Sequence, residues 1–492
     1  MNKKLMVAAV AGALFAPGLT LAQAPPPRAG SALTTPAQSP AFLRAPGGSD
    51  VTGSPGLSIY GRLDSMIMAN SYTEDYANRA IGANPATTGR SKVSKGDLYQ
   101  AGNSMGVRGR EDLGGGTIFF FQLEIGVWTE RLETSTVTGN NWGGRNSWLG
   151  FDSGLGGIYW GISDSPYKQV DFVGNLISSS GLSGAGIIMN NGDTTGALPN
   201  ALCTNTVNNG SGAVLVTSAN SSVCTTEATG GGTQFSRRNN DSINYRTPVI
   251  GGFQLRLQTA LNTYQSPSTS PGSATVAGGQ LPKAKYYSGA ALWARGPFEI
   301  GVGYDMHQAF RQTNTATANA NAKDTGVQVG ARWDFGMGVI GAGYEKLAYG
   351  AIDGAPITNA NRNSGKMDVP AYFVNARLNA GPGQVFVAYT ATPGGKSCFE
   401  HTPVAGTTNV GTTIGSASCG SDGKATIATL GYDYVLSKRT KFYVAYNKID
   451  NSDGTNYFYI AGPAGNNANG TSSGIQAGTD VSTFGVGVQH AF

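Results

Sequence analysis

Arginine and carboxylate side chains that could create a local electric field recur along this chain. The set consists of Arg62, Asp64, Arg108, Arg110, Glu124, Arg145, Asp164, Asp171 and Arg256. Opposite charges that face each other across a narrow, partly desolvated space order water and act on every ion that passes between them. We expect these residues to act on polar solutes through electrostatics. The alternative is that they only keep an interior hydrated.

The residues that catalysis or metal binding would need are few and badly spaced. The three histidines are His307, His401 and His490, and none lies in a Gly-x-Ser-x-Gly turn or beside a second metal ligand at a usable spacing. No phosphate-binding or dinucleotide-binding loop is present, and the many glycine pairs indicate turns. The sequence therefore predicts no enzyme activity, no cofactor and no metal site.

The N-terminal residues have the features of a secretory signal. Lys3 and Lys4 precede an apolar run over residues 5–15, and Pro17 then breaks the helix. We predict a signal peptide over residues 1–22, cleaved after Ala22, because cleavage after Ala24 would put a proline first. The apolar run is too short for a membrane anchor. Residues 23–56 are rich in Pro, Gly, Ser and Ala, which predicts a disordered lead.

The four cysteines fall into two pairs, Cys203 with Cys224 and Cys398 with Cys419, and each pair encloses twenty residues. Each pair lies in a stretch rich in Gly, Ser, Thr and Asn. An even number of loop cysteines in an exported protein predicts two local disulfides. Four free thiols are the alternative, and the spacing is too wide for a zinc site.

The last segment of the sequence alternates strictly between apolar and small or polar residues. One face would carry Phe484, Val486, Val488 and Phe492, with His490 as the one interruption, and the other Thr483, Gly485, Gly487 and Gln489. Successive side chains of a strand point to opposite faces. This pattern suits a strand with lipid on one side and water on the other.

The same unit repeats from Leu57 to Phe492. About ten alternating residues are followed either by a tight turn or by a long polar loop. Seven short turns alternate with eight long loops, over residues 71–98, 129–143, 164–238, 263–283, 309–322, 349–367, 393–423 and 451–478. This pattern predicts an all-β fold, a closed antiparallel transmembrane β-barrel of sixteen strands over residues 57–492. A soluble β-sandwich shows similar alternation, but sixteen strands without a break favour closure.

Strand alternation also predicts which charged side chains face the interior. Arg62 and Asp64 share a face with Tyr60, and Arg108 and Arg110 share the face opposite Val107. Arg256 lies opposite Leu255 and Leu257. The alternation places Arg145 outward, so an irregular strand start would be needed to turn it in. We expect the arginines to lie on one wall and to face Asp164 and Asp171 on the third loop.

Several segments together resemble a known family. They are residues 57–64 (LSIYGRLD), 102–116 (GNSMGVRGREDLGGG), 145–151 (RNSWLGF), 154–161 (GLGGIYWG), 239–248 (NNDSINYRTP) and 431–440 (GYDYVLSKRT). This combination resembles the general diffusion porins of Gram-negative bacteria, especially the β-proteobacterial type. The resemblance runs from about residue 57 to 492. Two positions depart from the family pattern, because Ser104 and Ile162 stand where a basic residue is common.

The resemblance implies a homotrimer of sixteen-stranded barrels in the outer membrane, in contact with lipid and lipopolysaccharide. Phe492 would be the signal that the barrel-assembly machinery recognises, and the third loop, residues 164–238, would fold into the lumen as a constriction. It further implies passive diffusion of ions and small hydrophilic solutes. The net charge of +5, or +3 without Lys3 and Lys4, adds a mild anion preference and is too weak to indicate nucleic acid.

Two other functions stay open at this point. The long cysteine-bearing loops would suit a substrate-selective or surface-binding barrel, whose loops close the lumen. A soluble secreted β-protein is the other alternative. A conductance measurement would distinguish a barrel closed by its loops from an open channel. Membrane fractionation would distinguish a soluble secreted protein from a membrane barrel.

Overall fold

The computed structural model describes the strands of the chain and part of the third loop. The described residues are 56–75, 90–100, 103–127, 144–177, 188, 235, 238–261, 285–308, 323–349, 367–394, 424–452 and 480–492. The predicted signal peptide, nearly all of the predicted lead and all four cysteines lie outside these residues, so both disulfides stay predictions.

These residues form seventeen strand segments and one helix, α2 (Pro166–Gly174). The strands are β1 (Gly56–Asp75), β2 (Arg90–Gln100), β3 (Ser104–Gly114), β4 (Thr117–Gly126), β5 (Ser147–Ser153), β6 (Gly156–Asp164), β7 (Arg238–Arg246), β8 (Phe253–Ala260), β9 (Lys285–Arg295), β10 (Phe298–Gln308), β11 (Lys323–Asp334), β12 (Gly338–Tyr349), β13 (Met367–Ala380), β14 (Gly383–Thr392), β15 (Ala425–Val435), β16 (Thr440–Asn451) and β17 (Val481–Ala491).

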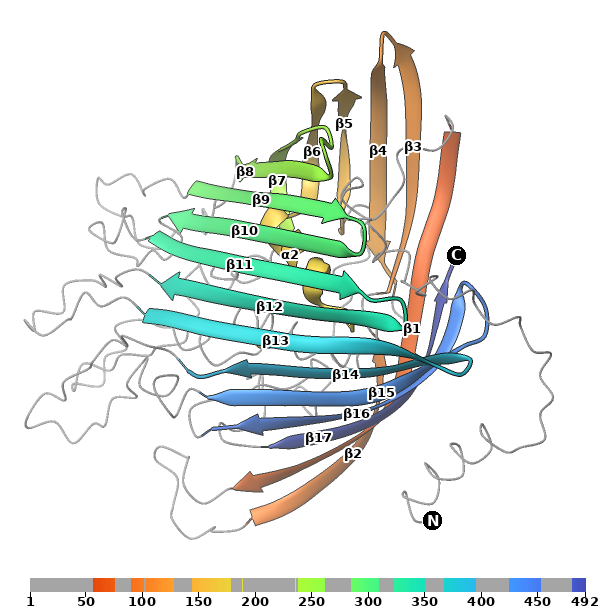
Figure 1. The fold of residues 1–492 in the computed structure, drawn as a ribbon, viewed down its shortest axis with the longest axis vertical. Coiled ribbons are helices and arrows are strands. Elements are labelled where there is room, and N and C mark those ends of the chain that lie inside the picture. The colour runs from red at the N-terminus through yellow and green to blue at the C-terminus, as the bar shows by residue number, and fades with distance from the viewer. Residues whose placement is uncertain are drawn as a thin grey trace, which may run out of the picture.

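The strands close into one antiparallel barrel (Figure 1). Apart from β2 and β3, which do not pair with each other, each strand pairs with its neighbour along the chain, and β1 pairs with β17 from Arg62↔Ala491 to Tyr72↔Val481. β2 and β3 both pair with β1, β3 along its first part and β2 along the rest. They therefore form one interrupted barrel strand, and the prediction of a sixteen-stranded closed barrel is confirmed.

The bounds of one predicted loop are wrong. Residues 71–98 were expected to form the first loop, but β1 continues to Asp75 and β2 begins at Arg90. Backbone pairing between β1 and β2 continues to Asp75↔Arg90. The β2 sequence is polar on both faces there, with residues such as Ser91, Lys92 and Ser94. Without an apolar face, the alternation that identifies the other strands is missing here.

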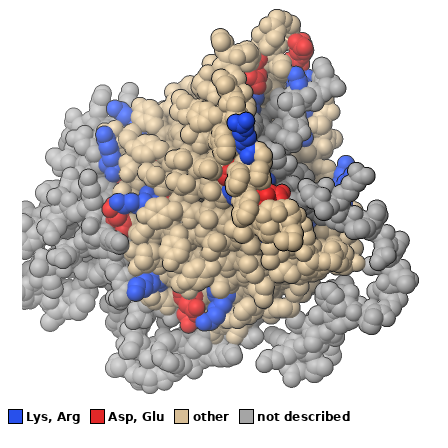
Figure 2. Space-filling view, viewed as in Figure 1, with Lys and Arg blue, Asp and Glu red and all other residues tan. Residues whose placement is uncertain are grey.

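Alternation separates the two faces of the wall as predicted. In β10, Ile300, Val302 and Tyr304 are exposed on the outside, whereas Glu299 and Asp305 are buried on the inside. The described outer surface seen in Figure 2 consists mainly of uncharged side chains, with isolated charges. Many exposed side chains on it are large and apolar, and a surface with few charges and many apolar side chains is what a surrounding bilayer covers.

None of the helical segments in the described part of the chain has the length and apolar character needed to span a membrane.

The barrel closes at a tight contact between Gly61 and Phe492. Each of these two residues donates its backbone N–H to the carbonyl oxygen of the other, at 3.0 Å in both directions. The Phe492 ring lies over Gly61, where a Cβ atom would collide with it. His490 stacks on the ring at a centroid distance of 6.3 Å. Only glycine at position 61 leaves room for this ring, which covers the junction of the first and last strands.

Substituting Gly61→Ala should weaken barrel closure, because the added methyl group must displace the Phe492 ring. Overpacking of this kind costs about 1–3 kcal/mol. The measurement is the temperature at which the refolded barrel loses its compact band on a denaturing gel. Gly154→Ala is the matched control, since a Cβ there meets nothing within 4 Å. Equal midpoints for the two variants would contradict the role given to Gly61.

Candidate functional site in the barrel interior

Helix α2 begins and ends at well-formed caps. The Ser165 side chain accepts a hydrogen bond from the backbone N–H of Lys168 at 3.0 Å, and Pro166 follows at the first helical position. At the other end, the N–H of Asn175 donates to the Asp171 carbonyl at 3.2 Å. These caps fix a nine-residue helix inside the barrel, within the third loop that the sequence predicted only as a constriction.

A glycine bed on the inner wall receives this helix. The bed consists of Gly301, Gly303, Gly326, Gly330 and Gly341, on β10, β11 and β12. A Cβ at Gly303 would lie 3.2 Å from both Tyr167 and Val170, and one at Gly330 would lie 3.0 Å from the Val170 carbonyl oxygen. Figure 1 shows α2 behind these strands. The absence of side chains therefore lets the helix lie directly against the wall.

Polar contacts hold the helix on the bed. The Tyr167 hydroxyl donates to Glu345 Oε2 at 2.9 Å, and the Tyr167 N–H donates to Ser288 Oγ at 3.1 Å. At the far end, Asn375 Nδ2 donates to the Gly174 carbonyl at 3.1 Å. Burial raises the pKa of Tyr167, and the neighbouring Glu345 raises it further. The hydroxyl therefore stays protonated and remains the donor.

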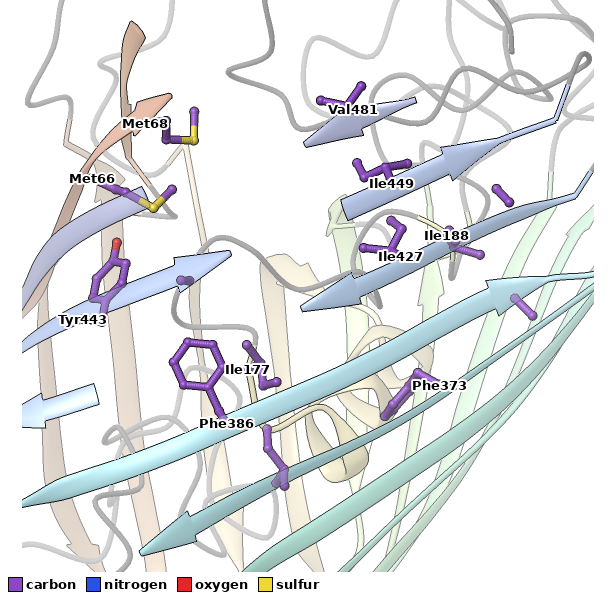
Figure 3. Close-up of a cluster of buried hydrophobic side chains, with 14 of the residues drawn as sticks. Met66, Met68, Ile177, Ile188, Phe373, Phe386, Ile427, Tyr443, Ile449 and Val481 are labelled. Carbon is purple, nitrogen blue, oxygen red and sulfur yellow. The ribbon is translucent and has the colours of Figure 1, made fainter. Parts of the chain in front are cut away.

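Part of the inner face of the wall beyond the helix is apolar. Ile177 and Ile188 of the third loop pack into a cluster with side chains from β1 and β12–β17 (Figure 3). Its larger members include Met66, Met68, Phe373, Phe386, Ile427, Tyr443 and Ile449. All are nearly inaccessible to solvent. This part of the interior is therefore packed and does not border water.

Water reaches a different part of the interior. Among the side chains that the structure describes, and leaving aside Asp112 and Asp334 beside the turns, the inward charged side chains and Tyr60 that keep partial exposure are Tyr60, Arg62, Arg108, Arg110, Arg145, Asp152, Lys168, Asp171, Arg238 and Arg332. Most of them lie on β1, on β3, before β5 and on α2. β1 and β10 are eight strands apart in a ring of sixteen, so α2 stands opposite β1. We call the part of the interior that these partly exposed side chains border the passage.

Basic groups outnumber acidic ones along this accessible surface. Seven of these side chains are basic and two are acidic. Apart from Asp112 and Asp334 beside the turns, the other described inward carboxylates, among them Asp64, Glu124 and Asp164, are buried. A solute in the passage therefore meets more positive than negative charge.

Glu124 is the buried counter-ion of Arg145. It accepts hydrogen bonds from the Tyr60 hydroxyl at 2.9 Å and from Arg145 Nε at 2.6 Å. The Arg108 guanidinium lies over the Tyr60 ring, 4.8 Å from its centroid. Arg145 precedes β5, where the chain bends at residues 144–146, and its N–H donates to the Glu124 carbonyl. This bend turns Arg145 toward the interior, against simple strand alternation.

Asp164 lies elsewhere than expected. It is the last residue of β6, not part of the third loop, and it is already paired with Arg238 at 3.1 Å and with Lys168 at 3.4 Å. Asp171 does lie on α2, where it accepts from Gln328. The two carboxylates that were expected to face the arginines from the third loop therefore lie on different elements, and only Asp171 is partly exposed.

The remaining predicted residues differ in exposure. Asp64 is buried and accepts from the Tyr443 hydroxyl at 2.6 Å and from Gln489 at 2.8 Å. Arg62 on the same strand is partly exposed. Arg110 lies in register with Phe120, near the turn between β3 and β4. Arg256 is buried and donates to Gln254 and to Gln169 of α2, so it fastens the helix to the wall.

Sequence reasoning missed several residues of this site. Lys168, Phe172 and Arg238 were not singled out, because they lie on or beside a helix within a long polar loop. The glycine bed left a signal, since glycine recurs at every second position in residues 301–303 and 341–343. That spacing marks one strand face without side chains, where another segment can approach.

Among the described residues, no group of three or more His, Cys, Asp or Glu side chains is arranged to hold a metal ion.

Filling the glycine bed should displace the helix. In Gly341→Ala, the new methyl group would collide with the Gly174 carbonyl oxygen, which moves the end of α2 toward the passage. We expect lower single-channel conductance and a loss of about 1–3 kcal/mol in stability. Gly289→Ala on β9 is the control, since its nearest neighbour would be at 3.4 Å. Unchanged conductance in a folded Gly341→Ala barrel would argue against the bed.

Known proteins share both sequence and fold with this chain. Residues 7–454 match the family described as Gram-negative porin. The major outer membrane protein P.IB of Neisseria gonorrhoeae is 34% identical over 105 residues, which are 19% of this chain and 28% of that protein. The chain thus spans little more than a quarter of the length of the curated relatives it matches.

A solved structure gives the same fold. The anion-selective porin from Comamonas acidovorans matches 89% of this chain and 100% of its own, with a TM-score of 0.55 at 18% identity. At that identity the likeness concerns the fold alone. The family points to a channel rather than an enzyme. Since the family match covers most of the chain and the strands close into a barrel, the chain belongs to the Gram-negative porin family and is a multi-pass outer-membrane β-barrel.

Proposed function

We propose that the chain forms a water-filled channel for passive diffusion of ions and small hydrophilic solutes, with a mild preference for anions. The observation that supports this preference is the excess of basic over acidic side chains on the accessible surface of the passage. Charged side chains that line a narrow pore select permeating ions by their sign. Arg62, Arg108, Arg110 and Arg145 are the proposed selectivity residues.

Two effects keep the preference small. Several of the basic groups are paired, as Arg145 is with Glu124 and Arg238 with Asp164. Mobile ions also screen charge, with a Debye length of about 8 Å at physiological ionic strength. The preference should therefore fade as salt concentration rises.

Neutralising two arginines of the passage should reduce the anion preference. In Arg108→Gln/Arg110→Gln, the zero-current potential in a salt gradient should move toward zero or change sign. Lys448→Gln is a control, because Lys448 is exposed on the outer face of β16 and pairs with Asp450 of the same strand. A potential that stays at the wild-type value in the double variant would overturn the assignment of these arginines.

Removing the buried counter-ion should have the opposite effect. Glu124→Gln keeps a hydrogen-bonding group for Tyr60 but removes one negative charge beside Arg145. The same zero-current measurement should then show a stronger anion preference. Asp450→Asn, which removes an exposed carboxylate, serves as the control. A shift toward cations in Glu124→Gln would contradict the assigned sign.

We also propose a homotrimer, embedded among outer-membrane lipid and lipopolysaccharide and inserted by the barrel-assembly machinery with Phe492 as its recognition signal. Support comes from the family to which the chain belongs. Chemical cross-linking in native outer membranes should give a ladder that stops at three subunits. A ladder that stops at one subunit would reject the trimer.

A further inference from the structure

One aromatic side chain on α2 faces water inside the barrel. The helix turns Tyr167, Val170 and Val173 toward the glycine bed, and Phe172 lies on the opposite side with 37% of its surface exposed. The other residues on that side, Lys168 and Asp171, are polar and partly exposed. An exposed aromatic ring on the helix that narrows a barrel offers passing solutes an apolar contact.

A positive charge accompanies this ring. Lys168 precedes Phe172 by four residues, so the two side chains are neighbours on the helix surface. Lys168 shares its carboxylate partner, Asp164, with Arg238. Two cations thus share one carboxylate at this end of the helix, while Asp171, the other carboxylate on this side, accepts a hydrogen bond from Gln328 of β11.

The opposite side of the passage repeats the combination. Tyr60 on β1 is partly exposed, and the Arg108 guanidinium lies 4.8 Å from the centroid of its ring. Because α2 stands opposite β1 in the ring of strands, an aromatic ring and a cation border the passage on each side.

We propose that Phe172 and Lys168 form a binding subsite for small carboxylates that carry an aromatic body, such as benzoate. The carboxylate would lie near the Lys168 ammonium group and the ring would pack on Phe172. A carboxylate without an apolar body, such as acetate, would use the charge alone. This inference rests on the proposed anion-conducting channel, and it adds the class of solute that the channel retains.

Stacking of two aromatic rings contributes about 0.5–1.5 kcal/mol beyond burial. This corresponds to roughly a two- to tenfold difference in binding. Benzoate should therefore reduce the chloride current at a concentration about two- to tenfold lower than acetate does. The quantity to compare between variants is this ratio of half-blocking concentrations, because it cancels changes in pore width.

The experiment uses the full-length purified protein in planar bilayers. Chloride conductance and the zero-current potential are measured first, followed by titration with benzoate and with acetate. In Phe172→Ala the benzoate-to-acetate ratio should approach one, whereas in Lys168→Gln both anions should weaken together. Phe151→Ala is the matched control, since Phe151 is exposed to a similar extent on the outer face of β5 and should keep the wild-type ratio.

The outcomes separate this inference from the function on which it rests. A wild-type protein that conducts with an anion preference but does not distinguish benzoate from acetate would overturn the subsite alone. So would a wild-type ratio in Phe172→Ala. A wild-type protein that conducts no ions, or prefers cations, would overturn the proposed channel itself. Phe172→Leu tests the chemistry of the contact, because retention of the full ratio there would reject aromatic stacking.

Discussion

Direct contact between the backbone of a helix and the backbone of a β-sheet determines the shape of this interior. Side chains normally keep a helix and a sheet apart, but the glycine bed has none. The helix therefore lies against one wall and leaves room for water on the side that carries Lys168 and Phe172. Its buried positions, such as Val170 and Val173, contact the wall, so the side toward the passage can carry Lys168 and Phe172. The side chains that α2 presents to the passage are thus determined by the close contact between the helix and the glycine bed.

Charge in the interior is distributed unevenly between buried and accessible positions. Carboxylates such as Asp64 and Glu124 are buried and receive hydrogen bonds from tyrosine, glutamine or arginine side chains. Burying a charge is unfavourable unless such partners compensate for the lost hydration. The long arginine side chains can instead extend their charged ends to water while their stems stay packed. Arginine side chains are longer than those of Asp and Glu, and this difference in length explains the excess of basic groups on the accessible surface of the interior.

The sequence predicted the barrel well because the bilayer imposes a strict rule on it. Lipid on one side requires an apolar residue at every second position, and the strands from β10 to β17 show this plainly. Where a strand extends past that boundary the rule no longer applies, which is why residues 71–75 and 90–98 were wrongly expected to belong to a loop. The interior obeys no such rule. Whether Arg256 lines water or fastens α2 depends on Gln169, which is distant in sequence, and the inward turn of Arg145 depends on a local bend.

The closing pair of strands has a consequence for the order of folding. With β2 and β3 counted as one barrel strand, every other strand pairing joins strands that follow each other along the chain, whereas Gln489 of β17 and Asp64 of β1 are 425 residues apart. Loop-closure entropy grows slowly with length, so joining such distant segments costs only roughly 3 kcal/mol more than closing a ten-residue hairpin. The eleven paired positions of β1 and β17 can offset this. The closing step is therefore limited by its rate. Until β1 and β17 pair, two open strand edges remain able to pair with other chains.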